Sequence, residues 1–141
     1  MKPVIDLVPI EELDRSILTL CTRINAETYE LLTLIREFDE RTGWLKWGAH
    51  SCAEWLAWRC DLSLATAREK VRVAHALKHL PLVSEAFSTG ELSYTKVRAL
   101  SRVATKVNEQ ELVAFALRHT ATHVAERAYA NRSLRISRNA E

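Results

Sequence analysis

The residues best suited to chemistry are arginines that recur in two similar stretches of the chain. Residues 62–74 and 92–104 share Leu, Ser, Arg, Arg, Val and Ala at an offset of 30 residues. Each stretch begins with Leu-Ser, and its two arginines stand four residues apart, which places them on one face of a helix. Arginines in this arrangement can bind phosphates, and one near a helix N-terminus can also pair with guanine.

The first stretch also has the parts of a helix-turn-helix. Ser51 and Glu54 form a capping box that predicts a short helix over 51–60. A turn at Asp61-Leu62-Ser63 then leads into a helix that begins at Leu64. In such a unit the second helix enters the major groove, and its N-terminal residues reach the base edges.

We therefore predict that duplex DNA is the partner, although the sequence departs from the usual helix-turn-helix in two places. Asp61 stands where glycine is usual, and Lys70 stands where an apolar residue is common. The alternative is that the arginines form the solvated face of an ordinary helical bundle. The predicted DNA-binding residues on the two stretches are Ser63, Thr66, Arg68, Lys70, Arg72, Lys96, Arg98 and Arg102.

Two pairs of histidines have the four-residue spacing that can share a metal ion on a helix. Neither pair brackets a glutamate as in H-E-x-x-H, and no third ligand is evident. We expect surface or capping histidines and predict no metal site. The pairs are His75 with His79 and His119 with His123.

The aromatic residues and the thiols favour a structural role. Four tryptophans within 15 residues could stack on single-stranded bases, but core packing is the preferred interpretation. The three cysteines have no C-x-x-C spacing, which favours free, buried thiols. These residues are Trp44, Trp47, Trp55, Trp58, Cys21, Cys52 and Cys60.

The sequence lacks the common catalytic motifs. There is no glycine-rich phosphate loop and no G-x-S-x-G, and no paired carboxylates or His-Cys arrangement stands out. We predict no enzyme activity and no cofactor for this chain. A ligand or metal found near His75 and His79 would revive an enzymatic interpretation.

These residues must be positioned by helices, because no stretch shows sustained two-residue alternation. Apolar residues recur every seven positions from Ile10 to Phe38, and this heptad repeat is broken at Glu27. One long helix over 10–42, or two helices with a bend near Asn25, fits this spacing, and Gly43 is expected to end it. The heptads can pack on the rest of the domain or on a second copy of the chain, and both alternatives remain open.

The sequence thus predicts an all-α multi-helix bundle with a long N-terminal helix and a central helix-turn-helix-like unit. A loop is expected at 43–50, and the inward-facing residues are expected to be Leu64, Ala67, Val71, Ala74, Leu77, Val97, Leu100, Val103 and Val107. Residues 1–141 form one domain, with a core at about 51–107 and C-terminal helices at about 108–134. The remaining helices are expected at 64–80, from Pro81 to Gly90, from Ser93 to about 107, at 108–118 and at 121–134.

Composition agrees with one globular domain. The 141 residues include only 3 Gly and 3 Pro, which excludes collagen, low-complexity linkers and turn-rich β-sandwiches. Residues 1–60 hold 7 basic and 10 acidic side chains, whereas residues 61–141 hold 13 and 8, so the second half is basic. No apolar run approaches the ~18 residues of a membrane span. We expect a soluble, cytoplasmic protein that has no membrane partner.

Five motifs lie between Leu31 and Val107, namely Phe38–Trp44, Ser51–Trp58, Leu62–Leu77, Leu80-Pro81 and Gly90–Leu100. Together they resemble the DUF222 family, also called the 13E12-repeat family, of actinobacteria. In that family the domain usually precedes an HNH endonuclease module. The resemblance implies a nuclease-associated domain without the nuclease, as a truncated chain or a short family member.

The order of these motifs is also similar to the helix-turn-helix of ParB-type partition proteins, in which the Leu-Ser helix contacts DNA. That similarity implies DNA contacts for Ser63, Thr66, Arg68 and Arg72. Our leading hypothesis is a DNA-binding helical domain that positions an associated HNH nuclease. The alternative is a protein-interaction or homodimerisation domain that uses the helix over 10–42.

Overall fold

The computed structural model describes residues 7–140, with side chains through residue 134, and this part of the chain contains helices and no strand. The all-α prediction is therefore confirmed. The two 3-10 helices are η2 (Gly43–Trp47) and η3 (Leu77–His79). The α-helices are α1 (Ile10–Glu40), α2 (Cys52–Arg59), α3 (Leu64–Ala76), α4 (Pro81–Ser88), α5 (Tyr94–Leu100), α6 (Glu109–Arg118) and α7 (Ala121–Ala140).

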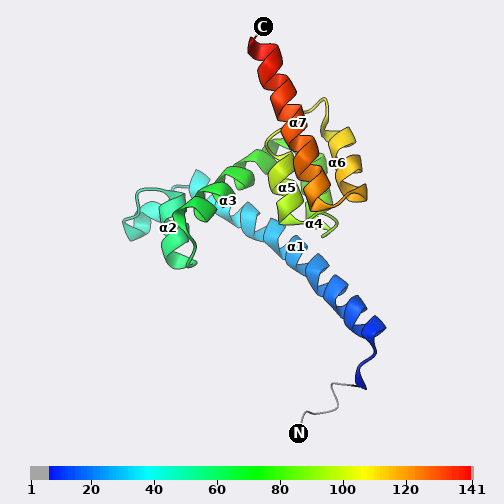
Figure 1. Cartoon of the computed structure of the whole chain (residues 1–141). Helices are drawn as coiled ribbons and strands as arrows, with labels where there is room; N and C mark the ends of the chain where they lie inside the picture. Colours follow the sequence, from blue (N-terminus) through cyan, green and yellow to red (C-terminus); the bar gives the residue numbers. More distant parts are fainter. Residues whose placement is uncertain (1–6, 141) are drawn as a thin grey trace.

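The long helix α1 is the spine of the molecule (Figure 1). Its C-terminal half packs against α3 and α4, while its N-terminal half projects away from the other helices. Helix α2 packs on α3 beside the C-terminal end of α1, and α7 lies against α5. Fully buried side chains fill the core between these helices, among them Leu32, Leu56, Val73 and Phe87.

Helix α1 is continuous, as the single-helix alternative predicts, and Asn25 docks it onto the turn after α4. The side-chain amide of Asn25 donates to the carbonyl oxygen of Gly90 at 3.2 Å. The predicted glycine cap is wrong, because Thr42 takes the left-handed conformation with φ 49° and Gly43 begins η2. A Cβ at Gly43 would overlap the ring of Phe38, so this glycine allows close packing.

Helix α5 ends at Leu100, seven residues before its predicted end. The side chain of Asn108 accepts from the backbone N–H of Thr105 at 2.6 Å and donates to the carbonyl of Val103 at 3.1 Å. Such side-chain bonds compete with helical hydrogen bonds and stabilise a turn instead. As a result Val107, predicted to face inward, is 96% exposed.

Three further burial predictions are wrong in part. Leu64 is exposed because it lies in the first turn of α3, beyond the helices that cover the rest of that face. Trp58 is exposed on α2, whereas Trp55 packs on Phe38 with ring centroids 4.3 Å apart. Cys21 and Cys60 are free but exposed.

Cys52 is the one cysteine of the described residues that is buried. Burial, together with the nearby charge of Asp39, raises the pKa of its thiol to about 11.

None of the described helices is long and apolar enough to cross a bilayer.

Candidate nucleic-acid interface

A short turn joins helices α2 and α3, and a serine caps the start of each helix. Ser51 accepts from the backbone N–H of Glu54 at 3.0 Å, and Ser63 accepts from that of Thr66 at 3.1 Å. The Ser63 hydroxyl also donates to the hydroxyl of Thr66 at 2.8 Å. Each cap satisfies a backbone N–H that the first helical turn leaves without a partner.

The turn between the helices depends on Asp61. This residue has φ 55°, the left-handed conformation for which glycine is the usual choice. Aspartate tolerates that conformation better than most residues with a Cβ. The backbone N–H of Leu62 then donates to the carbonyl of Ala57 at 3.0 Å and closes the turn. Asp61 therefore provides the left-handed backbone conformation that this turn needs and that glycine usually provides.

The N-terminal end of α3 presents most of its side chains to solvent. Ser63, Leu64, Ala65, Thr66 and Arg68 are all exposed, while Ala67 between them is fully buried. Among the described residues, no carboxylate lies within ion-pair distance of Arg68. This end of α3 is therefore an open helical surface with one guanidinium group available for a ligand.

Lys70, which stands where a helix-turn-helix commonly has an apolar residue, is half-buried on the side of α3 that faces Tyr94 of α5. Its Nζ lies 4.2 Å from the ring centroid of Tyr94 on α5, in a cation–π contact. Burial lowers the pKa of Lys70. Its methylene groups pack where an apolar residue is common, which explains why lysine is accommodated here.

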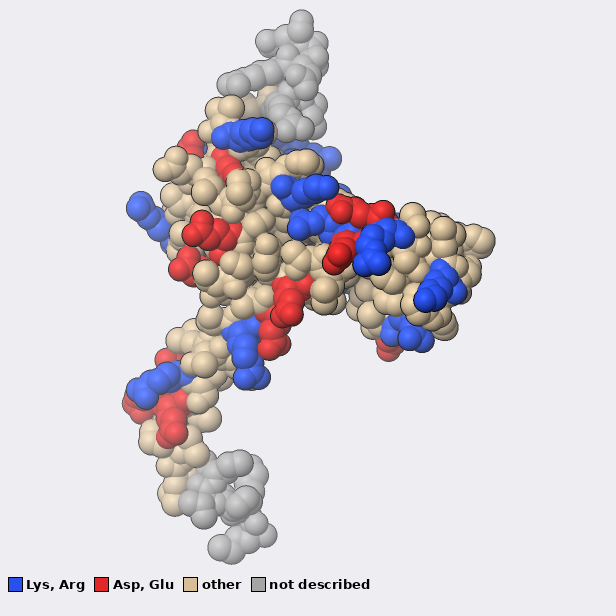
Figure 2. All heavy atoms as spheres, turned by 180° about the vertical axis from the view of Figure 1, so that it is seen from behind, with Lys and Arg blue, Asp and Glu red and all other residues tan. Residues whose placement is uncertain are grey.

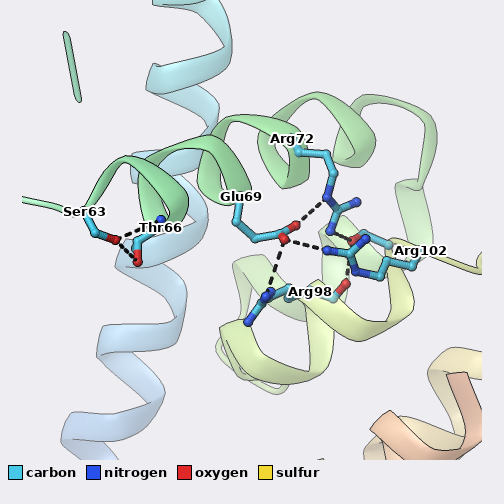
Figure 3. Close-up of polar contacts among 7 residues, drawn as sticks. Ser63, Thr66, Glu69, Arg72, Arg98 and Arg102 are labelled. Carbon is cyan, nitrogen blue, oxygen red and sulfur yellow. Dashed lines mark hydrogen bonds and ion pairs between the residues drawn. The ribbon is translucent and has the colours of Figure 1, made fainter. Parts of the chain in front are cut away.

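The remaining arginines of the two repeated stretches converge on one carboxylate (Figure 3). Glu69 accepts from Arg72 on its own helix, from Arg102 at 2.5 Å and from Arg98 at 3.4 Å. Arg72 also donates to the hydroxyl of Ser101 at 3.1 Å. The cluster therefore links α3 to α5, and it lies away from Ser63 and Thr66 at the start of α3.

The electrostatics of Glu69 follow from this cluster. Burial raises the pKa of its carboxyl group, but the hydrogen bond from Arg72 and the charges of Arg72, Arg102 and Arg98 outweigh burial. The net result is a pKa below the ordinary value. Glu69 thus stays ionised and neutralises part of the charge on which the sequence prediction depended.

Lys96 is also engaged within the protein. Its Nζ donates to the carbonyl of Ala116 near the C-terminal end of α6 at 2.7 Å. The eight predicted residues therefore separate into two groups. Three lie on the open end of α3, namely Ser63, Thr66 and Arg68, whereas Lys70, Arg72, Lys96, Arg98 and Arg102 make contacts within the domain.

The role of Glu69 is not evident from the sequence. The signal for it is weak, namely an acid at position i with an arginine at i+3 in the run Glu69-Lys70-Val71-Arg72. Basic and acidic side chains are also interspersed over the face shown in Figure 2, and they form no continuous basic stripe there.

The histidine pairs make structural contacts. His75 lies 2.6 Å from the carboxylate of Asp39, which also accepts from the indole of Trp44 at 3.0 Å. His119 stacks on Phe115 with ring centroids 3.8 Å apart and lies 2.8 Å from the carbonyl of the same residue. His75 thus joins α3 to α1, and His119 packs at the C-terminal end of α6.

Comparisons with known proteins identify the family. Residues 18–141 match the family described as "Domain of unknown function (DUF222)". No curated protein and no solved structure matches the chain. The similarity to ParB-type proteins therefore stays a prediction. The match covers most of the chain, so the protein belongs to the DUF222 family.

Proposed function

We propose that this domain binds duplex DNA through the N-terminal turns of α3. The observation that carries the proposal is the exposed end of α3, where Arg68 has no carboxylate partner among the described residues and the helix is held by α2 through the turn at Asp61. A helix presented in this way fits the major groove, which is about 12 Å wide. Arg68 would contact a guanine base or a phosphate, and Ser63 and Thr66 would contact the sugar-phosphate backbone of the DNA.

The cluster around Glu69 has an indirect part in this proposal. It fixes α5 beside α3 and leaves Arg98 half-exposed, so that arginine can add a phosphate contact. The family resemblance implies an HNH module after such domains. We propose that the domain would hold DNA for such a nuclease module.

The test is a fluorescence-anisotropy titration of the full chain with a short random-sequence duplex at several salt concentrations. We expect affinity to fall as salt rises, with a slope of about 0.9 per neutralised phosphate. Arg68→Ala should weaken binding and reduce that slope by about one contact. Circular dichroism checks that the variant keeps its helical content.

The matched control is Arg118→Ala, an exposed arginine in the last turn of α6. We expect this variant to bind as the unaltered protein does. The proposal fails if the chain does not bind duplex DNA at low salt, or if the Arg68 and Arg118 variants lose affinity equally.

A further inference from the structure

Helix α1 has two apolar faces, and the rest of the domain covers only one of them. Leu32 and Ile35 lie on the covered face and are buried. The other face is a stripe of apolar residues at the heptad positions, interrupted at Glu27, which we call the seam. Every apolar seam residue from Ile10 to Leu34 is at least 42% exposed, and these residues are Ile10, Leu13, Ile17, Leu20, Ile24, Leu31 and Leu34.

The seam continues into a groove at the C-terminal end of α1. The groove has a volume of about 560 Å³ and lies between α1, η2 and α2. Leu31, Leu34 and Phe38 line its α1 side, and Trp47 and Trp55 line the opposite side. An apolar surface of this extent on one helix is typical of an interface and not of a solvated face.

We propose that two copies of this chain associate through the seams of α1 in an antiparallel helical pair. A heptad seam on a 31-residue helix, about 46 Å long, is what a second helix with the same repeat fits. A second copy of the chain carries the same heptad repeat, and we therefore propose it as the partner that covers the seam.

Glu27 sets the direction of the pair, because it interrupts the seam close to the middle of α1. In a parallel pair in register, Glu27 would face Glu27 of the second copy, and two like charges would share the interface. In an antiparallel pair centred between Asn25 and Ala26, Glu27 faces Ile24 of the second copy instead. The two Arg23 and two Glu27 side chains then gather around the twofold axis with alternating charge.

The same antiparallel register matches the apolar residues along the rest of α1. Leu20 falls opposite Leu31 of the second copy, Ile17 opposite Leu34, and Leu13 opposite Phe38. The projecting end of each α1 would therefore cover the apolar groove of the other copy.

The charges at the two ends are complementary. The first turn of α1 carries Glu11 and Glu12. The groove that it approaches carries Arg41 and Lys46 against one acid, Glu37. Arg23 would also approach Glu30 of the second copy at the edge of the seam. An acidic helix end thus meets a groove with a basic excess.

The first test is sedimentation velocity of the full chain. We expect a dimer of twice the 16.1 kDa chain mass that dissociates on dilution. Ile17→Glu should give a monomer. Leu18→Glu is the matched control, because Leu18 is the next residue and is equally exposed at 61%, but lies off the seam. Both positions lie in a segment whose residues are all exposed, so the fold should survive, as circular dichroism can check.

The second test establishes direction by disulfide cross-linking, in a background in which the exposed Cys21 and Cys60 are replaced by serine. We expect a mixture of Leu20→Cys and Leu31→Cys chains to cross-link, whereas Leu20→Cys alone should not. Self-cross-linking of Leu20→Cys would indicate a parallel pair and overturn the proposal. A monomer at all concentrations, or a dimer that survives Ile17→Glu, would also overturn it.

Discussion

At the residue scale, Glu69 determines what the repeated arginines can do. One carboxylate holds three guanidinium groups, which come from α3, from α5 and from the turn after α5, so much of the charge in the repeats serves to join α3 and α5. Arg68 stands one position earlier and, among the described residues, has no carboxylate within ion-pair distance. Neighbouring residues of similar charge thus have different roles.

We expect Glu69→Gln to destabilise the domain by about 1–2 kcal/mol, because hydrogen bonds to charged groups are lost and three arginines are left without their counter-charge. The measurement is thermal unfolding at one protein concentration. Glu126→Gln, an exposed position on α7, is the control and should leave the melting temperature unchanged. Equal melting temperatures for the two variants would show that the cluster adds no stability.

The lowered pKa of Glu69 gives this effect a pH dependence of known sign. Stability that comes from a carboxylate with a lowered folded-state pKa is fully present above the unfolded value of about 4.3. It is lost as the pH falls through the folded-state pKa. The stability difference between the unaltered chain and Glu69→Gln should therefore be constant above about pH 5 and shrink below about pH 4.

At the element scale, α4 obtains its N-terminal cap from a distant helix. Its own N-cap residue, Leu80, has no side chain that can accept a hydrogen bond. The carboxylate of Glu109 accepts instead from the backbone N–H groups of Leu82 at 2.9 Å and Val83 at 3.0 Å. Glu109 is 4% exposed, so these bonds are shielded from water. A negative charge at this end also complements the helix dipole.

We expect Glu109→Ala to destabilise the protein by about 2–4 kcal/mol, because two backbone donors lose their partner at a buried site. Urea denaturation followed by circular dichroism measures the change in the free energy of unfolding. The control is Glu111→Ala, which removes an ion pair of an exposed glutamate with Arg127 and should cost less than about 1 kcal/mol. Similar losses for both variants would contradict the capping role.

The helix starts could be predicted because their causes are local. Ser51, Ser63 and Ser93 each cap a helix by a bond to the N–H three residues later, and sequence analysis can detect that spacing. The end of α5 and the cap of α4 could not be predicted, because they depend on Asn108 and Glu109 folding back onto earlier residues. Likewise, the start of α3 could be predicted from the local sequence pattern. The ion pairs of the arginines could not, because they depend on packing between segments about 30 residues apart.

At the scale of the whole molecule, Gly90 determines how closely α1 approaches the turn between α4 and α5. Gly90 has φ 82°, and a Cβ there would overlap the backbone carbonyl of Thr22. Gly48 has a similar φ of 76°, but a Cβ there would have no neighbour within 4 Å. The two glycines thus share the same conformational demand, and only one of them is at a crowded contact.

Comparing alanine at these two positions isolates the helix contact. Both variants carry the cost of a left-handed alanine, about 1–2 kcal/mol. We expect Gly90→Ala to lose about 1–3 kcal/mol more, because α1 must move away and the bond from Asn25 is strained. Thermal unfolding of the two variants measures this difference. Equal losses would mean that the close approach of α1 contributes no stability.

The cap on α4 also has a consequence for the order in which the chain can fold during synthesis. Val83 leaves the ribosome 26 residues before Glu109 does. At about 5–20 residues per second, this delay is about 1–5 s. During that interval the first N–H groups of α4 bind water instead of a carboxylate. The central helices therefore complete their packing only after the start of α6 has been synthesised, although every core residue of α1 to α4 is already present.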